Sequence, residues 1–474
     1  MSTPNQTNFI DLNDDCCYHI YKFLSIVDWS SLRDTCTRFR TISDYCFDRR
    51  RRTFELSDIS NSSNKMEPSE VKRVLRAFGR FMKTLSIDRE RFKRNTDCNV
   101  LVLFLDRYCR SLVDLELANF RLTRTTIVQC RRLFSSLQRL VIDEWNDEAA
   151  FTAFTSCLAT CASLTELEFI GLYGIVGDSL ANRRIASLKS FKMSGSIGFS
   201  CKAIKSFLTK NDQLTQIKLW DLHFKDHEGA DNILEHVANK LLKLEALSLQ
   251  FNINFMPNIF PVTEMPLLKK LEVNLEYIVR VEEMLRGLTV LNNLEDLHLI
   301  FFKCNVESIR LLTLLKSLKI LKLSEPYNLD RDMCKRLASG LPGLEEIHIT
   351  VRNEETSLNE IKEIVLLVPN LRRIVFNRIA RIRPPIAIAP EVFQSLVEIR
   401  KSQATKEILL IFLNDKDLCD IENELKSSEI GKKLAEHGSL LKMLKLDKEY
   451  RRTLSNYWVR MNPAFCATSG AGFF

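Results

Sequence analysis

A short pattern of apolar positions recurs along most of the chain: an apolar residue, two of any kind, an apolar residue, one of any kind and a third apolar residue. LVDLEL at 112–117 is one example. The pattern occurs twelve times at spacings of 24 to 30 residues, and so regular a period indicates an internal repeat. Its copies begin at Met82, Leu112, Leu137, Leu164, Leu188, Leu214, Leu244, Leu268, Leu294, Leu318, Leu344 and Leu371.

The end of each copy alternates apolar and polar residues, as in LEL, IKL and LHL, which predicts a short strand with one buried face. The stretches between copies, among them CKAIKSFLTK and DMCKRLASG, have the apolar spacing of helices. A unit of one strand and one helix cannot bury its apolar face alone, so neighbouring units must stack. The pattern therefore predicts an α/β solenoid with a continuous core.

These residues resemble the leucine-rich repeat family over about 80–385. The resemblance implies a curved horseshoe, with parallel strands on its concave face and helices on its convex face. One feature departs from the family: the asparagine that usually stands eight places after the first apolar residue occurs here only at Asn252. The turn that follows each strand is therefore not predicted.

Residues 12–50 carry a different pattern, which predicts three short helices. We expect Asn13 or Asp14 to cap the first and Asp28 to cap the second, with the third beginning near Thr37. Some 40 residues form a small core, and segments of that size usually need a neighbour or a partner. The apolar residues expected to face inward are Cys17, Ile20, Tyr21, Leu24, Trp29, Leu32, Cys36, Phe39, Ile42 and Tyr45.

The order of residues in this segment resembles the F-box. Asn13 stands where the family prefers proline, and Cys17 stands where it prefers leucine. The resemblance implies that a Skp-family adaptor docks on the segment. The residues it assigns to adaptor binding are Leu12, Cys17, Ile20, Phe23, Leu24, Leu32 and Phe39.

An F-box followed by leucine-rich repeats implies the substrate receptor of an SCF-type ubiquitin ligase. Through the adaptor the chain would join a cullin and a RING subunit, and its repeats would hold a protein target for ubiquitination and degradation. The chain itself would not be an enzyme. The alternative is a leucine-rich repeat scaffold or inhibitor whose N-terminal helices only cap the solenoid.

The side chains of each strand that flank its third apolar residue should point away from the core. Most are polar, but Trp220 and Ile300 are apolar, and Phe251 and Phe301 follow the same strands. Exposed apolar groups rimmed by cations are typical of binding hot spots, which predicts a substrate site. An alternative is that the C-terminal region or residues 252–266 cover these groups. The predicted site consists of Lys218, Trp220, Phe251, His298, Ile300 and Phe301.

Catalytic and cofactor motifs are absent from the sequence: there is no GxSxG, GxxxxGK or GxGxxG. His223 and His227 lie four apart, but no third ligand stands at a recognisable spacing. Cys157 and Cys161 share a helix face and are interpreted as core residues. We therefore expect no metal and no cofactor.

The net charge of +8 is concentrated between Arg49 and Arg94, which includes the run Arg49–Arg52. A basic segment can bind nucleic acid, carry a nuclear address or meet an acidic partner, although a solvated face is the simplest interpretation. No RNA-binding motif accompanies the charge, so nucleic acid is not an expected partner. The 14 cysteines include no CxxC pair, as expected in the cytoplasm or nucleus, and no apolar run predicts a membrane segment.

The expected organisation has five parts. They are an F-box at 8–52, a linker and entry to the solenoid at 53–80, about twelve repeats at 81–390, a C-terminal cap at 391–462 and a flexible tail at 463–474. In the cap, residues 406–415 should form a last strand, and the stretch from Gly431 should form closing helices.

Overall fold

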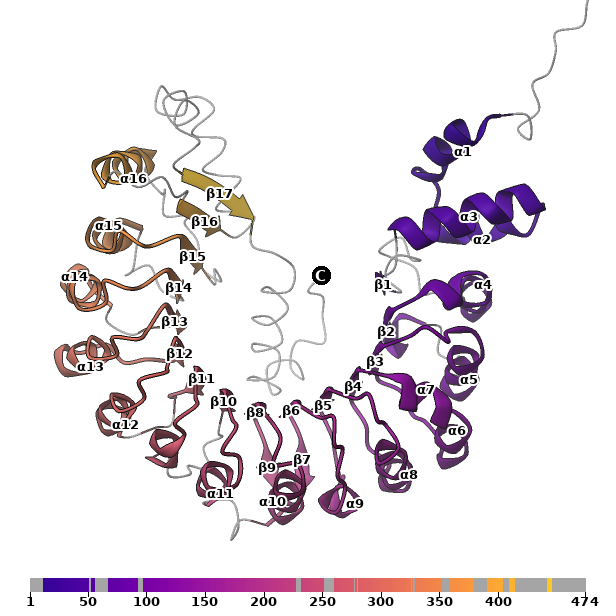
Figure 1. The fold of residues 1–474 in the computed structure, drawn as a ribbon, viewed down its shortest axis with the longest axis horizontal. Helices are drawn as coiled ribbons and strands as arrows, with labels where there is room; N and C mark the ends of the chain where they lie inside the picture. Colours follow the sequence, from indigo (N-terminus) through magenta and orange to yellow (C-terminus); the bar gives the residue numbers. More distant parts are fainter. Residues whose placement is uncertain are drawn as a thin grey trace, which may run out of the picture. The chain divides into compact units, whose positions relative to one another are not determined.

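The computed structural model describes residues 12–50, 53–55, 67–92, 97–226, 232–250, 260–276, 278, 280–324, 326, 329–351, 358–378, 390–403, 409–413 and 441–445. The chain divides into two compact units, Met1–Leu241 and Leu242–Phe474. Within each unit, parallel strands form one layer and helices form a second layer on its outer side (Figure 1).

The first unit begins with three helices and continues as strand–helix repeats. The N-terminal helices are α1 (Asp14–Tyr21), α2 (Ile26–Arg33) and α3 (Thr37–Arg50). The strands that follow are β1 (Thr53–Glu55), β2 (Thr84–Asp88), β3 (Asp114–Ala118), β4 (Arg139–Asp143), β5 (Glu166–Ile170), β6 (Ser190–Ser194), β7 (Ile197–Phe199), β8 (Gln216–Trp220) and β9 (His223–Phe224). The helices between them are α4 (Pro68–Phe78), η3 (Gly79–Phe81), η4 (Arg89–Arg91), α5 (Cys98–Tyr108), α6 (Arg124–Gln129), α7 (Arg131–Ser136), α8 (Glu148–Leu158), α9 (Asp178–Ala181), α10 (Cys201–Lys210) and α11 (Ile233–Lys240).

The second unit has the same alternation. Its strands are β10 (Ala246–Gln250), β11 (Lys270–Asn274), β12 (Asp296–Ile300), β13 (Ile320–Ser324), β14 (Glu346–Val351), β15 (Arg373–Arg378), β16 (Leu409–Leu413) and β17 (Leu441–Lys445). Its helices are η6 (Phe260–Glu264), α12 (Val281–Leu288), α13 (Val306–Leu312), α14 (Arg331–Gly340), α15 (Leu358–Leu367) and α16 (Pro390–Ser402).

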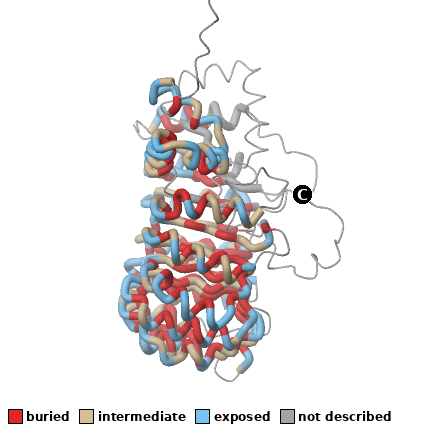
Figure 2. The backbone as a smooth tube through the Cα atoms, turned by 90° about the vertical axis from the view of Figure 1, so that its right-hand side faces the viewer, coloured by how far each residue is buried: buried red, intermediate tan, exposed pale blue. Residues whose placement is uncertain are grey.

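All twelve strands predicted from the repeated pattern are present, two residues after each first apolar position. Neighbouring strands pair in parallel with equivalent residues in register, so that Leu271, Leu297 and Leu321 follow one another across β11, β12 and β13. These leucines are fully buried against the helix layer. Figure 2 shows buried positions recurring along the chain, with exposed positions on the outer side of the helices. The α/β repeat fold expected from the sequence is confirmed.

Strand pairing continues beyond the predicted repeats at both ends. β1 lies in the segment 53–80 that was expected to be a linker, and it pairs with β2 of the first repeat. β16 lies within the last strand expected at 406–415. The expectation of helices from Gly431 is wrong at Leu441–Lys445, which forms β17 in parallel with β16. In LKMLK the apolar residues Leu441 and Met443 are two apart, and pairing with a neighbouring strand satisfies that period better than a helix does.

The turn after each strand has a recurrent left-handed residue. Its place is seven after the first apolar residue, and φ there is 60° at Asn119, 61° at Gly171 and 48° at Asp221. Glu144 and Phe301 occupy the same place with φ of 56°. Glycine, asparagine and aspartate tolerate this conformation best, which explains most of the residue choices.

The residue after this turn enters the core instead of supplying the family's asparagine. Phe120, Trp145, Leu172 and Phe302 stand at this eighth place, and all four are buried. Trp145 contacts the rings of Phe151 and Phe154 at centroid distances of 6.2 and 5.2 Å, both on α8. Apolar packing therefore fixes the chain after these strands.

Twelve of the cysteines lie in the described part of the chain, where none forms a disulfide and ten are buried. This agrees with their interpretation as core residues, including Cys157 and Cys161. Among the helices described, none is both long and apolar enough to cross a bilayer.

Candidate protein-binding surfaces

Local capping interactions define the three N-terminal helices. Asn13 is the N-cap of α1, where its side chain accepts a hydrogen bond of 2.8 Å from the Cys16 amide. Ser25, and not Asp28 as predicted, is the N-cap of α2. Asp28 lies three residues later and completes a capping box, in which its carboxylate accepts the Ser25 amide proton at 3.2 Å. Asn13 and Ser25 therefore each begin a helix with a side-chain cap.

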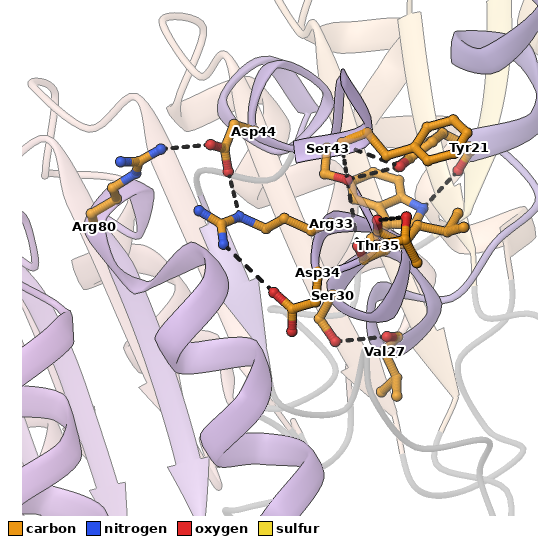
Figure 3. Close-up of polar contacts among 12 residues, drawn as sticks. Tyr21, Val27, Ser30, Arg33, Asp34, Thr35, Ser43, Asp44 and Arg80 are labelled. Carbon is orange, nitrogen blue, oxygen red and sulfur yellow. Dashed lines mark hydrogen bonds and ion pairs between the residues drawn. The ribbon is translucent and has the colours of Figure 1, made fainter. Parts of the chain in front are cut away.

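A buried polar contact joins the three helices at their centre. Tyr21 Oη donates to Ser43 Oγ at 2.8 Å, and Ser43 in turn donates to the Phe39 carbonyl at 2.7 Å (Figure 3). Trp29 Nε1 donates to the Tyr21 carbonyl at 2.9 Å. Burial raises the pKa of the Tyr21 phenol, against the opposing effect of its bond to Ser43, so the phenol keeps its proton. α1, α2 and α3 thus share one satisfied core.

The predicted adaptor-binding residues divide between this core and the surface. Ile20, Phe23 and Leu24 form a cluster at the end of α1, which we call the α1 cluster, and Phe23 is 78% exposed. Ile20 and Leu24 are half-buried. Cys17 and Phe39 are buried among the three helices, as their inward-facing pattern predicts, so neither side chain is presented at the surface.

The two remaining predicted docking residues, Leu12 and Leu32, are half-buried. Leu12 precedes α1, and its carbonyl accepts a hydrogen bond from Arg38, which also forms an ion pair of 2.7 Å with Asp14. Arg38 therefore anchors the beginning of the segment to α3.

The side of the segment formed by α2 and α3 packs against the first repeat. Phe47 on α3 stacks on Phe78 of α4 with centroids 4.6 Å apart and planes inclined by 2°. Asp44 accepts from Arg33 at 2.9 Å and from Arg80 at 2.6 Å, and so links α2, α3 and η3 (Figure 3). The helical segment therefore also covers the end of the solenoid.

On the strand face of the first unit, the predicted site residue Trp220 is only 8% exposed. Its neighbour Lys218 lies over the indole ring, with Nζ 4.0 Å from the centroid. Farther along the same sheet Arg139 lies 2.9 Å from Asp114, 3.7 Å from Glu166 and 4.0 Å from Glu168. The prediction of an exposed tryptophan is therefore wrong, and the strand face carries charged groups beside it and farther along the sheet.

On the strand face of the second unit, Ile300 and Phe301 are also buried, which corrects the prediction for both. Adjacent parallel strands lie about 4.8 Å apart, so side chains on this face cover one another. Ile300 stands in register between Asn274 and Ser324, and both of these are buried as well. Phe251 lies outside the described residues.

His298, the remaining predicted site residue, is the centre of a hydrogen-bond network across four strands. Its Nδ1 lies 2.7 Å from Glu272 Oε1, and its Nε2 lies 2.8 Å from Ser324 Oγ. Ser248 Oγ donates to the other Glu272 oxygen at 2.6 Å. Sequence reasoning missed Glu272, although polar residues at the third position of successive strands were a visible signal.

A second histidine, His348, lies on the same strand face of the second unit and hydrogen-bonds Glu346, which Arg373 approaches to 3.3 Å. Burial lowers the pKa of His348 and outweighs the opposing effect of Glu346. For Glu346, burial acts to raise the pKa, but the bond to His348 and the nearby cations hold it below its usual value. The Glu346 carboxylate on this face is thus close to both a histidine and an arginine.

Metal-binding geometry does not occur in the described part of the chain: no three histidine, cysteine, aspartate or glutamate side chains are placed to share an ion. His223 lies 3.4 Å from Asp221, and His227 lies outside the described residues.

The strand–helix repeats and their turns decide the fold. It is a leucine-rich repeat fold. A scan against known family models finds no match, and a search of curated proteins finds none either. Among solved structures, a chain of the crystal structure of the Rad7 and Elc1 complex in yeast aligns with 82% of this chain and 98% of its own length, at 14% identity and a TM-score of 0.44. Because both values are low, the assignment rests on the geometry of the repeats themselves.

Proposed function

We propose that the protein is the substrate-recognition subunit of an SCF-type ubiquitin ligase. In this proposal a Skp-family adaptor binds the N-terminal helical segment, and through it a cullin and a RING subunit. A protein target binds the strand face of the leucine-rich repeats and is ubiquitinated for degradation in the cytoplasm, the nucleus or both. The ubiquitin chemistry takes place on the partner subunits.

The α1 cluster is the observation that carries the proposal. Phe23 is 78% exposed, with its ring against that of His19, and it follows half-buried Ile20 and precedes half-buried Leu24 on a segment with a hydrogen-bonded core. Covering such a side chain contributes about 1.5 to 3 kcal/mol, and a few anchors of this kind dominate most interfaces. Leu12 and Leu32 remain part of the proposed surface because they are half-buried, whereas Cys17 and Phe39 act by supporting it.

For the target, the proposed contacts shift from apolar to polar groups. Trp220, Ile300 and Phe301 are largely covered, while Lys218 and His298 keep part of their surface. His298 is held by Glu272 and Ser324, so a target meets an ordered hydrogen-bonding surface. Ordered polar groups favour a specific partner because little conformational entropy is lost on binding.

The test is the affinity of the purified chain for a Skp-family adaptor. Replacing Ile20 and Leu24 together with alanine should weaken binding by about 3 to 5 kcal/mol, because both groups would be anchors. A matched control replaces Val290 and Leu314, two exposed apolar residues outside the helical segment, and should leave the affinity unchanged. Undiminished adaptor binding by a folded Ile20 and Leu24 variant would contradict the proposal.

A second candidate function is a leucine-rich repeat scaffold or inhibitor without ubiquitin chemistry. The stack of Phe47 on Phe78 and the contacts of Asp44 with Arg33 and Arg80 favour it, because a cap would need contacts of this kind with the first repeat. The candidates differ in one measurement. A scaffold of this kind would not bind a Skp-family adaptor, with or without the α1 cluster.

A further inference from the structure

The outer helix layer of the first repeats carries an unusual excess of positive charge. α4, α5, α6 and α7 contain seven lysines and arginines against two carboxylates, Glu70 and Asp106. We call the seven cations the basic helix face. They are Lys72, Arg73, Arg76, Arg107, Arg124, Arg131 and Arg132.

The next helices of the same unit do not share this excess. α8, α9, α10 and α11 together hold four lysines and three carboxylates. Among the helices of the first unit the excess is thus limited to α4 to α7, which lie next to one another in Figure 1. Cations scattered only for solubility would be distributed over the whole layer.

Most of the basic helix face is accessible and unneutralised. Arg76, Arg107 and Arg124 are exposed, and none forms an ion pair with any described residue. Of the two carboxylates, Asp106 is already engaged. It lies 3.0 Å from Arg132 and accepts the Leu133 amide at 2.9 Å.

The two aromatic rings between these cations, Phe104 and Tyr108, are half-buried, lie 5.3 Å apart and each have a cation close by. Lys72 Nζ lies 5.4 Å from the centroid of Phe104, and the Arg107 guanidinium lies 5.5 Å from that of Tyr108. Single-stranded nucleic acid is normally bound by stacking bases on open aromatic faces, and these two rings already contact each other and a cation. Exposed Val128 on α6 offers instead an apolar contact suited to side chains of a polypeptide.

We propose that the basic helix face is a docking surface for an acidic polypeptide segment, rich in glutamate or aspartate and carrying apolar residues between the charges. The surface is separate from both the α1 cluster and the strand face. A partner held there would be recruited by long-range attraction, and its association would weaken as salt increases.

The probe is a fluorescein-labelled peptide of glutamates interrupted by leucines, and binding to the full chain is measured by fluorescence anisotropy. Replacing Arg76, Arg107 and Arg124 together with glutamate should weaken binding by at least about tenfold. The matched control reverses Lys202, Lys210 and Lys225, which are exposed cations of the same unit, and should change the affinity by less than about twofold. If the glutamate variant does not fold, the same three positions are changed to glutamine.

Oligothymidine of equal charge is the competing probe. Tighter binding of oligothymidine than of the peptide, lost in the Arg76, Arg107 and Arg124 variant, would assign the surface to nucleic acid and overturn the proposal. Equal weakening by the control variant, or no peptide binding by the native chain, would overturn it as well. Adaptor affinity measured on the same variants should stay native, so this result is independent of the proposed ligase function.

Discussion

Replacing Asn211 with alanine should destabilise the first unit more than most substitutions of a polar residue. Asn211 follows α10 and is fully buried. Its Oδ1 accepts the Ile185 amide at 2.8 Å, and its Nδ2 donates to the carbonyls of Arg183 at 2.9 Å and Phe207 at 2.8 Å. One side chain thus connects the end of one repeat with the loop that enters the strand of the preceding repeat.

The magnitude follows from the groups that would lose their partners. The Phe207 carbonyl also accepts the Asn211 amide at 3.1 Å and stays satisfied, and the half-buried Arg183 can turn to water. The Ile185 amide is buried and would have no replacement, which costs about 1 to 3 kcal/mol. The other two hydrogen bonds would each contribute about 1 kcal/mol or less, because solvent can replace part of each. The total loss in the free energy of unfolding is then about 3 kcal/mol.

The assay is urea unfolding of the full chain followed by circular dichroism, with the free energy of unfolding compared between variants. Asn293 provides the control, because its Nδ2 also bridges two repeats, donating to the Pro266 carbonyl at 2.8 Å, but it is exposed. Its replacement with alanine should cost about 0.5 kcal/mol or less. A loss below about 1 kcal/mol for the Asn211 variant would refute the assignment of its three bonds.

Three further predictions concern stability and reactivity. Burial lowers the pKa of His348, so below about pH 6.5 the unfolded chain binds a proton more readily than the folded chain does. Stability should therefore be intact above about pH 6.5 and fall below it. A His348→Gln variant should show a smaller fall of the melting temperature between neutral and acid pH. Iodoacetamide at neutral pH should alkylate exposed Cys16 but spare Cys109, whose thiol pKa burial raises to about 12, and rapid labelling of native Cys109 seen by mass spectrometry would contradict this. Gly177→Ala should cost about 2 kcal/mol or more, because φ is 80° and the new Cβ would lie 1.9 Å from Phe199 Cζ; a native melting temperature would be the contrary result.

The strands were predictable because their apolar residues recur at a period that only a strand–helix repeat satisfies. The conformation of the turns after the strands was less predictable. Glycine and asparagine at Gly171, Gly195 and Asn119 signal a left-handed residue, but Glu144 and Phe301 adopt the same conformation without any such signal. At those two places the neighbouring strands and the buried residue that follows impose the backbone, which local preference cannot reveal.

The candidate surfaces show a different limit of the sequence. Periodicity identifies the apolar residues of a helix but not which of them its neighbours will cover. Cys17 and Phe39 were expected to face inward and are buried, whereas Tyr45 was expected inward by the same pattern and is 42% exposed. Likewise Trp220 and Ile300 were predicted to be exposed from strand alternation alone, but both are buried. Alternation tells which face of the sheet a side chain lies on and not how far its neighbours bury it.

The two functions considered for the N-terminal helices use different residues of the same segment and are therefore compatible. Phe47 and Asp44 face the first repeat, where they contact Phe78 and Arg80, while the α1 cluster has no role in that contact. A cap needs only the first side, because its task is to cover the apolar end of a solenoid. The exposed Phe23 adds nothing to such a cap and carries a cost in solubility, which an apolar docking partner would remove. Replacing Phe23 with alanine should accordingly change adaptor affinity with little effect on the melting temperature, because Phe23 is 78% exposed, and substitutions at Phe47 should do the reverse.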